Sequence, residues 1–478
     1  MPGELGSVQA DAGDTLPRYE IEAALDFGQR KLPAVISGSL RLTVPRASVS
    51  ADAILLRLYP NDAGYGDGSL SIVLATVDGV AVTPALSAGD TVAALPAAPG
   101  QQDVAVKIDF ITRVPVHSRH GFGMFSADPD ARVLTLAHWY PMLAGVGPEG
   151  PALAPPSQIG DPVFSGSALY DVTLTAPADL ALITGGSVIE GSVVDGRQRV
   201  RIAGGPAREF AMVAARGFEP LTVLSGDVSV TSWAPAAERE GSARVAGWAA
   251  AALDAFSRRF GPYPFRELNL VAKDLYGAAG MEFPGLILVS PVHYREDDGE
   301  RRFGEMVVAH EVAHQWWYGT VLNDQNIDAF VDEGISEYLA ARVYFEDLYG
   351  LSEGRRQFGL LVEDWMEGQL AAGGDVVVDA PTDAYPDRAT YAAAVYAKAS
   401  LALDAIRAEI GDDAFFGALR ELAVARRFDV IAAADVRDAF GDACGCDIGP
   451  LWAEWFEQRR MDPPGPATPT PTASSTAG

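Results

Sequence analysis

The sequence predicts a multidomain α+β protein, in which an N-terminal all-β domain precedes a mainly helical domain. The chain has 478 residues, 48% of them apolar and 21% charged, which is enough for two to four domains with large cores. From about residue 19 to residue 218, short apolar or alternating runs are separated by Gly, Pro, Asn and Asp, as in all-β domains. From about residue 240 onward, apolar residues recur instead at helical spacing.

The N-terminal β domain is expected to span residues 19–222, after a flexible segment of residues 1–18. Its strands should be short, and no helix of any length is expected between them. The clearest strand candidates are 54–59, 69–76, 104–110, 170–175 and 199–202.

The second domain is expected to span residues 223–460 and to begin with a helix over 243–257. Two strand-like runs then predict a small sheet, and the rest of the domain should be helical. The strands are expected at 267–271 and 286–289, and the helices at 305–318, 328–348, 353–371, 390–410, 413–426, 433–441 and a last one ending near Arg459. The Pro- and Thr-rich tail, residues 461–478, is expected to be disordered because it has too little apolar surface to bury.

The chain is strongly acidic, with 64 Asp and Glu against 36 Lys and Arg and a net charge of −28. Such a surface repels phosphate backbones and anionic lipids, so binding of nucleic acid or of a membrane surface is disfavoured. No run of about 18 apolar residues predicts membrane insertion. The N-terminus lacks the pattern of a signal peptide, whereas Pro/Thr-rich tails are commoner on exported proteins. We therefore expect a soluble protein, with export after removal of a signal favoured over a cytoplasmic location.

The two cysteines, Cys444 and Cys446, lie in one Cys-Gly-Cys segment. This arrangement excludes a framework of disulfides and a zinc site built from four thiolates. The favoured interpretation is two small residues at a tight turn, and the alternative is a local disulfide or redox pair.

The chain contains six histidines, and two of them form a motif with a glutamate. His310 and His314 lie four residues apart, so on a helix they share one face at the spacing that lets two imidazoles bind one Zn²⁺. Glu311 should reach a water molecule activated by that zinc without reaching the metal, which is the position of a general base. A random motif of this kind is expected about once in two hundred such chains, so the pattern strongly indicates a zinc site.

A catalytic zinc site needs a third protein ligand, and the next predicted helix supplies one. Glu333 follows His314 by 19 positions, which allows a turn and an antiparallel return that completes a His₂Glu set for one Zn²⁺ per chain. Glu337, one turn later, is either a solvated helical residue or the acceptor for the second ring N–H of a ligand histidine.

These motifs resemble those of the aminopeptidase N and leukotriene hydrolase family of gluzincin zinc peptidases. The zinc pair is His-Glu-Val-Ala-His at 310–314 with Val-Asp-Glu-Gly at 331–334. Ala-Gly-Met-Glu-Phe at 279–283 resembles the family's Gly-x-Met-Glu-Asn segment, and Val-Tyr-Ala-Lys-Ala at 395–399 its Val-Tyr-x-Lys-Gly segment. Leu-Tyr-Pro-Asn at 58–61 resembles the N-terminal domain of bacterial members, and the match extends over roughly residues 19–460.

The resemblance implies a thermolysin-like fold for the catalytic domain and substrates that are peptides with a free N-terminus. Tyr396 would donate a hydrogen bond to the oxyanion of the tetrahedral intermediate. Glu282 would bind the α-ammonium group of the substrate, while the backbone of Ala279 and Gly280 pairs with the substrate like an added strand.

The sequence also departs from the family pattern. Ala279 replaces the first Gly of the recognition segment, Phe283 replaces its Asn, and no second amine-binding residue is evident in the β domain, where the segment beginning at His138 occupies that region. The chain has no residues left for the family's C-terminal helical domain, so we expect an uncapped cleft. The alternatives to an aminopeptidase are therefore a zinc endopeptidase or other zinc hydrolase, and a catalytically silent scaffold of the same fold. The sequence contains no signal for an oligomeric state.

Overall fold

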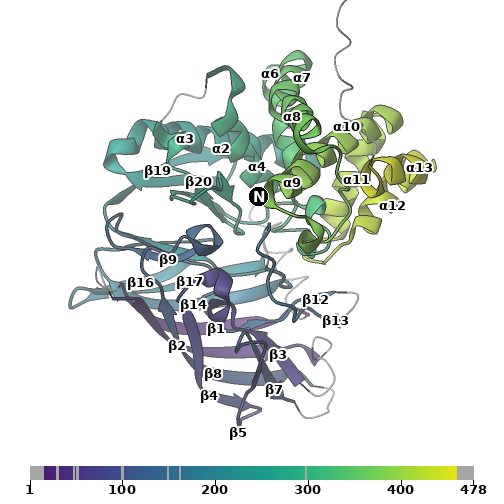
Figure 1. The fold of residues 1–478 in the computed structure, drawn as a ribbon. Helices are drawn as coiled ribbons and strands as arrows, with labels where there is room; N and C mark the ends of the chain where they lie inside the picture. The colour runs from purple at the N-terminus through teal and green to yellow at the C-terminus, as the bar shows by residue number, and fades with distance from the viewer. Residues whose placement is uncertain are drawn as a thin grey trace, which may run out of the picture.

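The computed structural model describes residues 15–27, 32–46, 49, 53–97, 102–147, 150–160, 163–295 and 299–459. A sheet-rich N-terminal region is followed by a mainly helical C-terminal region, and the two stack on each other in Figure 1. This arrangement confirms the predicted fold class. Most of the N-terminal segment predicted to be flexible and the whole Pro/Thr-rich tail lie outside the described residues.

The largest sheet of the N-terminal region has eight strands in the order β16-β17-β14-β1-β2-β8-β4-β5. Burial alternates strictly along β1, so that Tyr19, Ile21 and Leu25 enter the core while their neighbours face solvent. The strands are β1 (Arg18–Asp26), β2 (Ala34–Val44), β4 (Ser69–Val77), β5 (Val80–Val82), β8 (Val104–Val114), β14 (Ala168–Pro177), β16 (Ser187–Val194) and β17 (Arg197–Ala207).

Two four-stranded sheets pack with the large sheet into one hydrophobic core. Among the described residues, this region contains only short 3₁₀ turns as helical structure, as expected. The first small sheet is β15-β18-β10-β9 (Ala181–Thr184, Met212–Ala215, Val133–Leu136, Phe125–Asp128), and the second is β11-β3-β7-β6 (Met142–Leu143, Ala53–Arg57, Val92–Pro96, Ala85–Ser87). The turns are η2 (Tyr59–Asn61), η3 (Ala63–Tyr65) and η4 (His120–Gly123), and a separate hairpin pairs β12 (Val146–Gly147) with β13 (Gly150–Pro151).

The C-terminal region begins with a five-stranded sheet in the order β19-β20-β21-β23-β22. Helix α2 (Arg239–Phe260) packs against β19, β20 and the helix α4. The two-residue strand β22 lies at one edge of the sheet and pairs only with β23. The strands are β19 (Phe218–Ser225), β20 (Val228–Pro235), β21 (Glu267–Ala272), β22 (Gly280–Met281) and β23 (Leu286–Val289).

Helices joined by loops form most of the remaining chain, and three of the expected long helices change pitch along their length. Each contains a π-helical segment, a feature often found at functional sites and not visible in the hydrophobic pattern. The first is α5 (Glu333–Tyr338), η8 (Leu339–Tyr344) and α6 (Phe345–Tyr349); the second is α7 (Leu351–Phe358), η9 (Gly359–Glu363) and α8 (Asp364–Gly373); the third is α9 (Arg388–Ala392), η11 (Ala393–Lys398) and α10 (Ala399–Ile410). The other helices are α3 (Val292–Arg295), α4 (Phe303–Ala313), α11 (Asp412–Ala425), α12 (Ala433–Cys444) and α13 (Gly449–Trp452) continued by η12 (Ala453–Glu457).

The helix expected at 305–318 ends earlier than predicted, at Ala313. After it, the amide of Gln315 donates to the carbonyl of Val312 and the amide of Trp316 to that of Ala313, which tightens the chain into a turn. His314 caps the helix with helical backbone angles, so the shorter helix still presents both histidines on one face.

The structure joins Cys444 and Cys446 in a disulfide, which corrects the favoured prediction of two reduced residues at a turn. Their Cα atoms are 5.2 Å apart, within the range that a disulfide bridges. Gly445 between them adopts a left-handed conformation that glycine tolerates without a Cβ penalty, which closes this short loop.

In the described part of the chain, no helix is both long and apolar enough to cross a membrane.

Candidate zinc active site

Three side chains from two helical segments converge on one point. His310 belongs to α4 and His314 caps it, while Glu333 begins α5 on the returning chain. The two Nε2 atoms are 2.9 Å apart, and each lies 3.1 Å from Oε2 of Glu333. All three residues are buried. The structure thus brings together the three metal ligands predicted from the sequence.

The outer nitrogens of both histidines face acceptors. Nδ1 of His310 lies 3.0 Å from Oε2 of Glu337, which is the second of the two alternatives considered for that glutamate. Nδ1 of His314 lies 3.0 Å from the carbonyl oxygen of Trp317 and 3.2 Å from Oγ of Ser336. These contacts favour the tautomer with the proton on Nδ1, which leaves both Nε2 lone pairs directed at the common point.

This donor set fits a zinc ion. Four ligand atoms at 2.0–2.1 Å around a tetrahedral ion are separated by about 3.3 Å, close to the distances between these three atoms. Two imidazole lone pairs and a carboxylate so close together repel one another unless a cation lies between them. Burial lowers the pKa of His314, whereas at His310 the carboxylates of Glu333 and Glu337 outweigh burial and raise the pKa; at Glu333 the two histidines outweigh burial and keep the pKa low.

Glu311 lies beside this cluster and is 5% exposed. One ligand atom each from Glu282, Glu311 and His314 lie within 4.8 Å of one another. Gly280 passes so close to Glu311 that a Cβ at this glycine would collide with the carboxylate. The absence of a side chain at Gly280 therefore lets the edge strand β22 approach the predicted general base.

The predicted amine-binding segment, residues 279–283, contains the edge strand β22. Glu282 is 3% exposed, and the preceding Ala279 accepts a hydrogen bond from the amide of Ser290. Gln315, which follows the zinc motif directly, fixes this segment: its Oε1 accepts from the amide of Gly285 at 2.8 Å, and its Nε2 donates to the carbonyl of Phe283 at 3.3 Å. The sequence reasoning missed Gln315, although its adjacency to the motif was a usable signal.

Tyr396 lies on the π-helical segment η11, half-buried. Its ring stacks on His310, with centroids 5.8 Å apart and planes inclined by 20°. The ring centroids of Tyr391 and Trp365 lie 6.1 Å and 6.3 Å from the centroid of the same Tyr396 ring. These aromatic neighbours orient the Tyr396 side chain at the metal cluster.

A buried ionic cluster from the β domain supports the site, and the sequence reasoning did not identify it. Glu209 contacts Nε2 of His138 and accepts a hydrogen bond from the hydroxyl of Tyr318, while the Arg208 guanidinium lies 4.2 Å from the Tyr318 ring centroid. Burial alone would raise the pKa of Glu209, but His138, Tyr318 and Arg208 lower it overall. Burial and Glu209 raise the pKa of Tyr318, so its phenol remains a donor beside the ring of His314.

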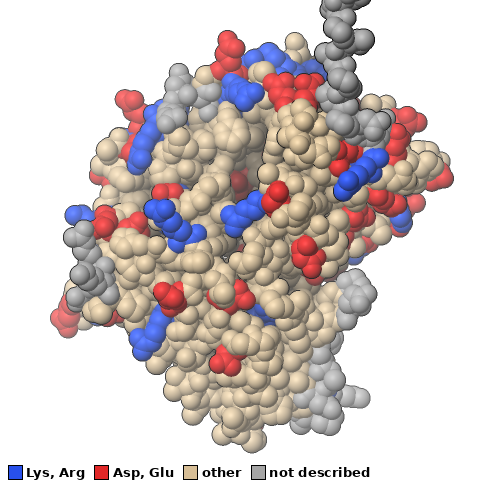
Figure 2. All heavy atoms as spheres, viewed as in Figure 1, with Lys and Arg blue, Asp and Glu red and all other residues tan. Residues whose placement is uncertain are grey.

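The predicted catalytic and substrate-binding residues, together with the predicted metal ligands His310 and Glu333, line a single cavity of about 340 Å³. Figure 2 shows the surface hollowed between the part of the molecule that holds α4 and the part that holds α8 and α9. The cavity walls come from both regions of the chain. They include Phe122, Gly160, Ala279, Gly280, Glu282, Phe303, Met306, Val307, His310, Glu311, Glu333, Glu337, Trp365, Arg388, Tyr391 and Tyr396.

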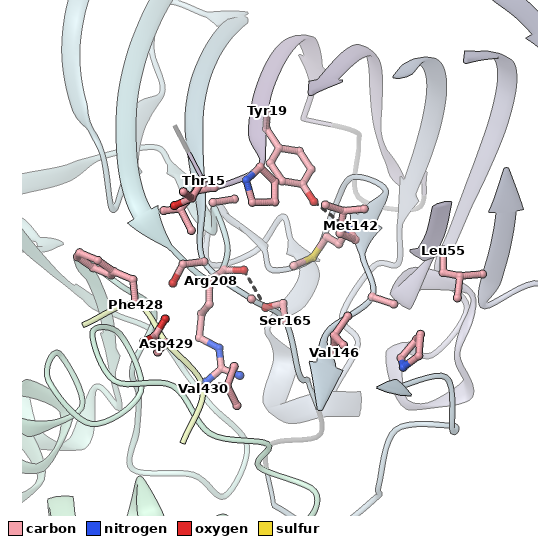
Figure 3. A pocket seen from close by; sticks show the side chains of 18 residues that line it. Thr15, Tyr19, Leu55, Met142, Val146, Ser165, Arg208, Phe428, Asp429 and Val430 are labelled. Carbon is pink, nitrogen blue, oxygen red and sulfur yellow. Dashed lines mark hydrogen bonds between the residues drawn. The ribbon is translucent and has the colours of Figure 1, made fainter. Parts of the chain in front are cut away.

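Another cavity, of about 250 Å³, lies between the β domain and the loop at 428–430 (Figure 3). It includes none of the predicted site residues. Its buried cation, Arg208, already donates to the carbonyls of Val163 and Asn323, and the hydroxyl of Ser165 bonds to the Arg208 carbonyl. We therefore place the chemistry in the cavity that contains His310 and Glu311.

The chain is similar in sequence to known zinc peptidases over part of its length. Residues 246–455 match the sequence profile of the Peptidase family M1 domain. Aminopeptidase N of Lactobacillus delbrueckii subsp. lactis is 25% identical over 210 residues, and that of Lactococcus lactis subsp. lactis is 26% identical over 210 residues. Each alignment covers 41% of this chain and 24% of the relative, so the chain matches about a quarter of the length of these curated relatives.

The fold also resembles a solved structure over nearly the whole chain. It aligns with a mutant of the M1 zinc metallopeptidase from Deinococcus radiodurans bound to a Tyr-Ser-Ala substrate, with a TM-score of 0.67 and 18% identity. The alignment covers 94% of this chain and 95% of that one. The resemblance read from the sequence is thereby confirmed, and both regions of the chain have the arrangement found in an M1 zinc metallopeptidase.

Proposed function

We propose that this protein is a zinc aminopeptidase that removes N-terminal residues from peptides, and the match of residues 246–455 to the Peptidase family M1 domain supports this proposal. The observation that carries the proposal is the proximity of Glu282 to Glu311 and His314, whose ligand atoms lie within 4.8 Å of one another. In a peptide, the α-nitrogen and the carbonyl carbon of one residue are only two bonds apart. An ammonium group bound by Glu282 therefore brings the first peptide bond, and no later one, to Glu311.

The edge strand supports the same substrate orientation. β22 ends its sheet, so an extended peptide can add beside Gly280 as a further strand. The missing side chain at Gly280 keeps this edge flat next to Glu311. A substrate held there has its N-terminus at Glu282 and its first carbonyl at the metal cluster.

Zinc held by His310, His314 and Glu333 would lower the pKa of the attacking water and polarise the scissile carbonyl. Glu311 accepts the proton of the attacking water and then delivers it to the nitrogen of the leaving peptide. Tyr396 donates a hydrogen bond to the carbonyl oxygen as negative charge develops on it, because its phenol is a neutral donor. Glu337 holds His310 in the required tautomer throughout.

The test is a panel of aminoacyl reporter substrates assayed with and without a chelator. We expect about one zinc per chain by metal analysis, hydrolysis of the free-amine reporters, loss of hydrolysis with the chelator and recovery when zinc is restored. Hydrolysis that continues after complete metal removal would contradict the proposal. Zinc binding well below one per chain under repletion would instead favour the silent scaffold considered from the sequence.

A further inference from the structure

The substrate cavity contains one positively charged side chain among several acidic ones. Of the described Lys and Arg residues, Arg388 alone lines this cavity, whereas Glu282, Glu311, Glu333 and Glu337 all do. Arg388 is exposed, and within the described part of the chain it forms no ion pair with a carboxylate. An arginine that faces a substrate cavity without an acidic partner can bind a carboxylate supplied by the substrate.

The guanidinium is held from the β-domain side. Nη2 of Arg388 donates to the carbonyl oxygen of Gln158 at 3.3 Å, and the guanidinium carbon lies 4.8 Å from the Phe122 ring centroid. A guanidinium has five N–H donors, so most of them remain for a ligand. The aromatic contact and the single carbonyl bond fix the position of the group without neutralising its charge.

Arg388 lies on the side of the cavity that the β domain forms. The β domain contributes Phe122 and Gly160 to the cavity, and its His138 ring lies 6.4 Å from the ring of Phe283, which follows the amine-binding Glu282. Phe303, Met306 and Val307 of α4 also line the cavity, and they belong to the catalytic region rather than to the β domain. The side chain of the first substrate residue is therefore expected on the wall shared by Arg388 and the β domain.

We propose that Arg388 is a carboxylate-binding subsite of this cavity, which deepens the proposed function by naming a substrate class and rests on it. One source of the carboxylate is the side chain of an N-terminal Asp or Glu. The other is the C-terminus of a short peptide. Arg388 precedes Tyr396 by eight positions, about 12 Å along a helix, and an extended chain covers that distance in about three to four residues.

Two substrate pairs separate these sources. The first pair is a glutamyl and a glutaminyl reporter, and the second is a tetrapeptide with a free C-terminal carboxylate and its C-terminal amide. At low ionic strength, we expect the wild-type enzyme to favour the carboxylate member of one pair by about 5-fold to 10-fold in kcat/KM. Arg388→Gln should reduce that ratio to about one, and Arg388→Lys should keep part of it.

The matched control is Arg420→Gln, which removes an exposed arginine of α11 that does not line the cavity and should keep the wild-type ratio. A preference in the reporter pair assigns the subsite to an N-terminal acidic side chain, and one in the tetrapeptide pair assigns it to the C-terminus. No preference in either pair, or a preference that survives Arg388→Gln, would overturn the assignment. If the wild-type enzyme cleaves none of the four substrates, the result contradicts the proposed function and this assignment with it.

Discussion

Replacement of Glu311 by Gln is expected to leave zinc bound while kcat falls by about 10³-fold. Gln is close to Glu in size and keeps the hydrogen-bonding shape of the side chain, but it cannot accept a proton from water. Glu311 is not one of the three atoms that converge at 2.9–3.1 Å, so the metal ligands remain complete. Metal analysis and steady-state kinetics on the same preparation separate the two effects.

A control for this variant is Glu367→Gln, which removes an exposed carboxylate of α8 outside the cavity. Its kcat should equal that of the wild-type enzyme. If Glu311→Gln hydrolyses peptides at the wild-type rate with zinc bound, Glu311 is not the general base. If the variant loses its zinc, Glu311 contributes to metal binding, which would contradict its placement outside the ligand set.

Glu282→Gln is expected to lower kcat/KM for free-amine peptides by about 10-fold to 100-fold. The carboxylate of Glu282 is buried, so its interaction with an ammonium group is stronger than that of an exposed ion pair. The amide keeps a hydrogen-bond acceptor but removes the charge that compensates a buried ammonium group. Steady-state kinetics on a tripeptide measure the change.

Glu282→Asp is the matched variant, because it keeps the charge and shortens its reach. We expect it to retain more kcat/KM than Glu282→Gln. Equal kcat/KM for the wild-type enzyme and Glu282→Gln would show that the amine is recognised elsewhere. Gln315 contacts the backbone of this segment rather than its carboxylate, so the position of the segment should not depend on either substitution.

The convergence of the three predicted metal ligands could be expected from the sequence because its geometry is nearly local. His310 and His314 lie one helical turn apart, and any helix places them on the same face. Glu333 needed only a turn and an antiparallel return. The helix ended at Ala313 rather than at residue 318, yet both histidines kept the predicted arrangement because His314 retains helical backbone angles.

The supporting residues were not predictable in the same way. Glu209 and Tyr318 are 109 positions apart in the sequence. No local sequence pattern predicts that a carboxylate of the β domain will contact the phenol that follows the zinc motif. The sequence contains no signal that separates Arg388 from other surface arginines, and only the assembled structure shows that it lines the cavity. The π-helical segment that carries Tyr396 is also not identified by the hydrophobic pattern, because its six residues are too few to separate the period of a π-helix from that of an α-helix.

The central claim is that this zinc site acts on the first peptide bond of a chain with a free amine. Its most direct test compares kcat/KM of the zinc-loaded wild-type enzyme for a tripeptide and for the N-acetylated form of the same tripeptide. We predict that the free peptide is cleaved at least about 100-fold faster, since acetylation removes the charge that Glu282 binds and adds atoms where the chain should end. Equal or faster cleavage of the acetylated peptide would contradict the claim and identify the enzyme as an endopeptidase or another zinc hydrolase.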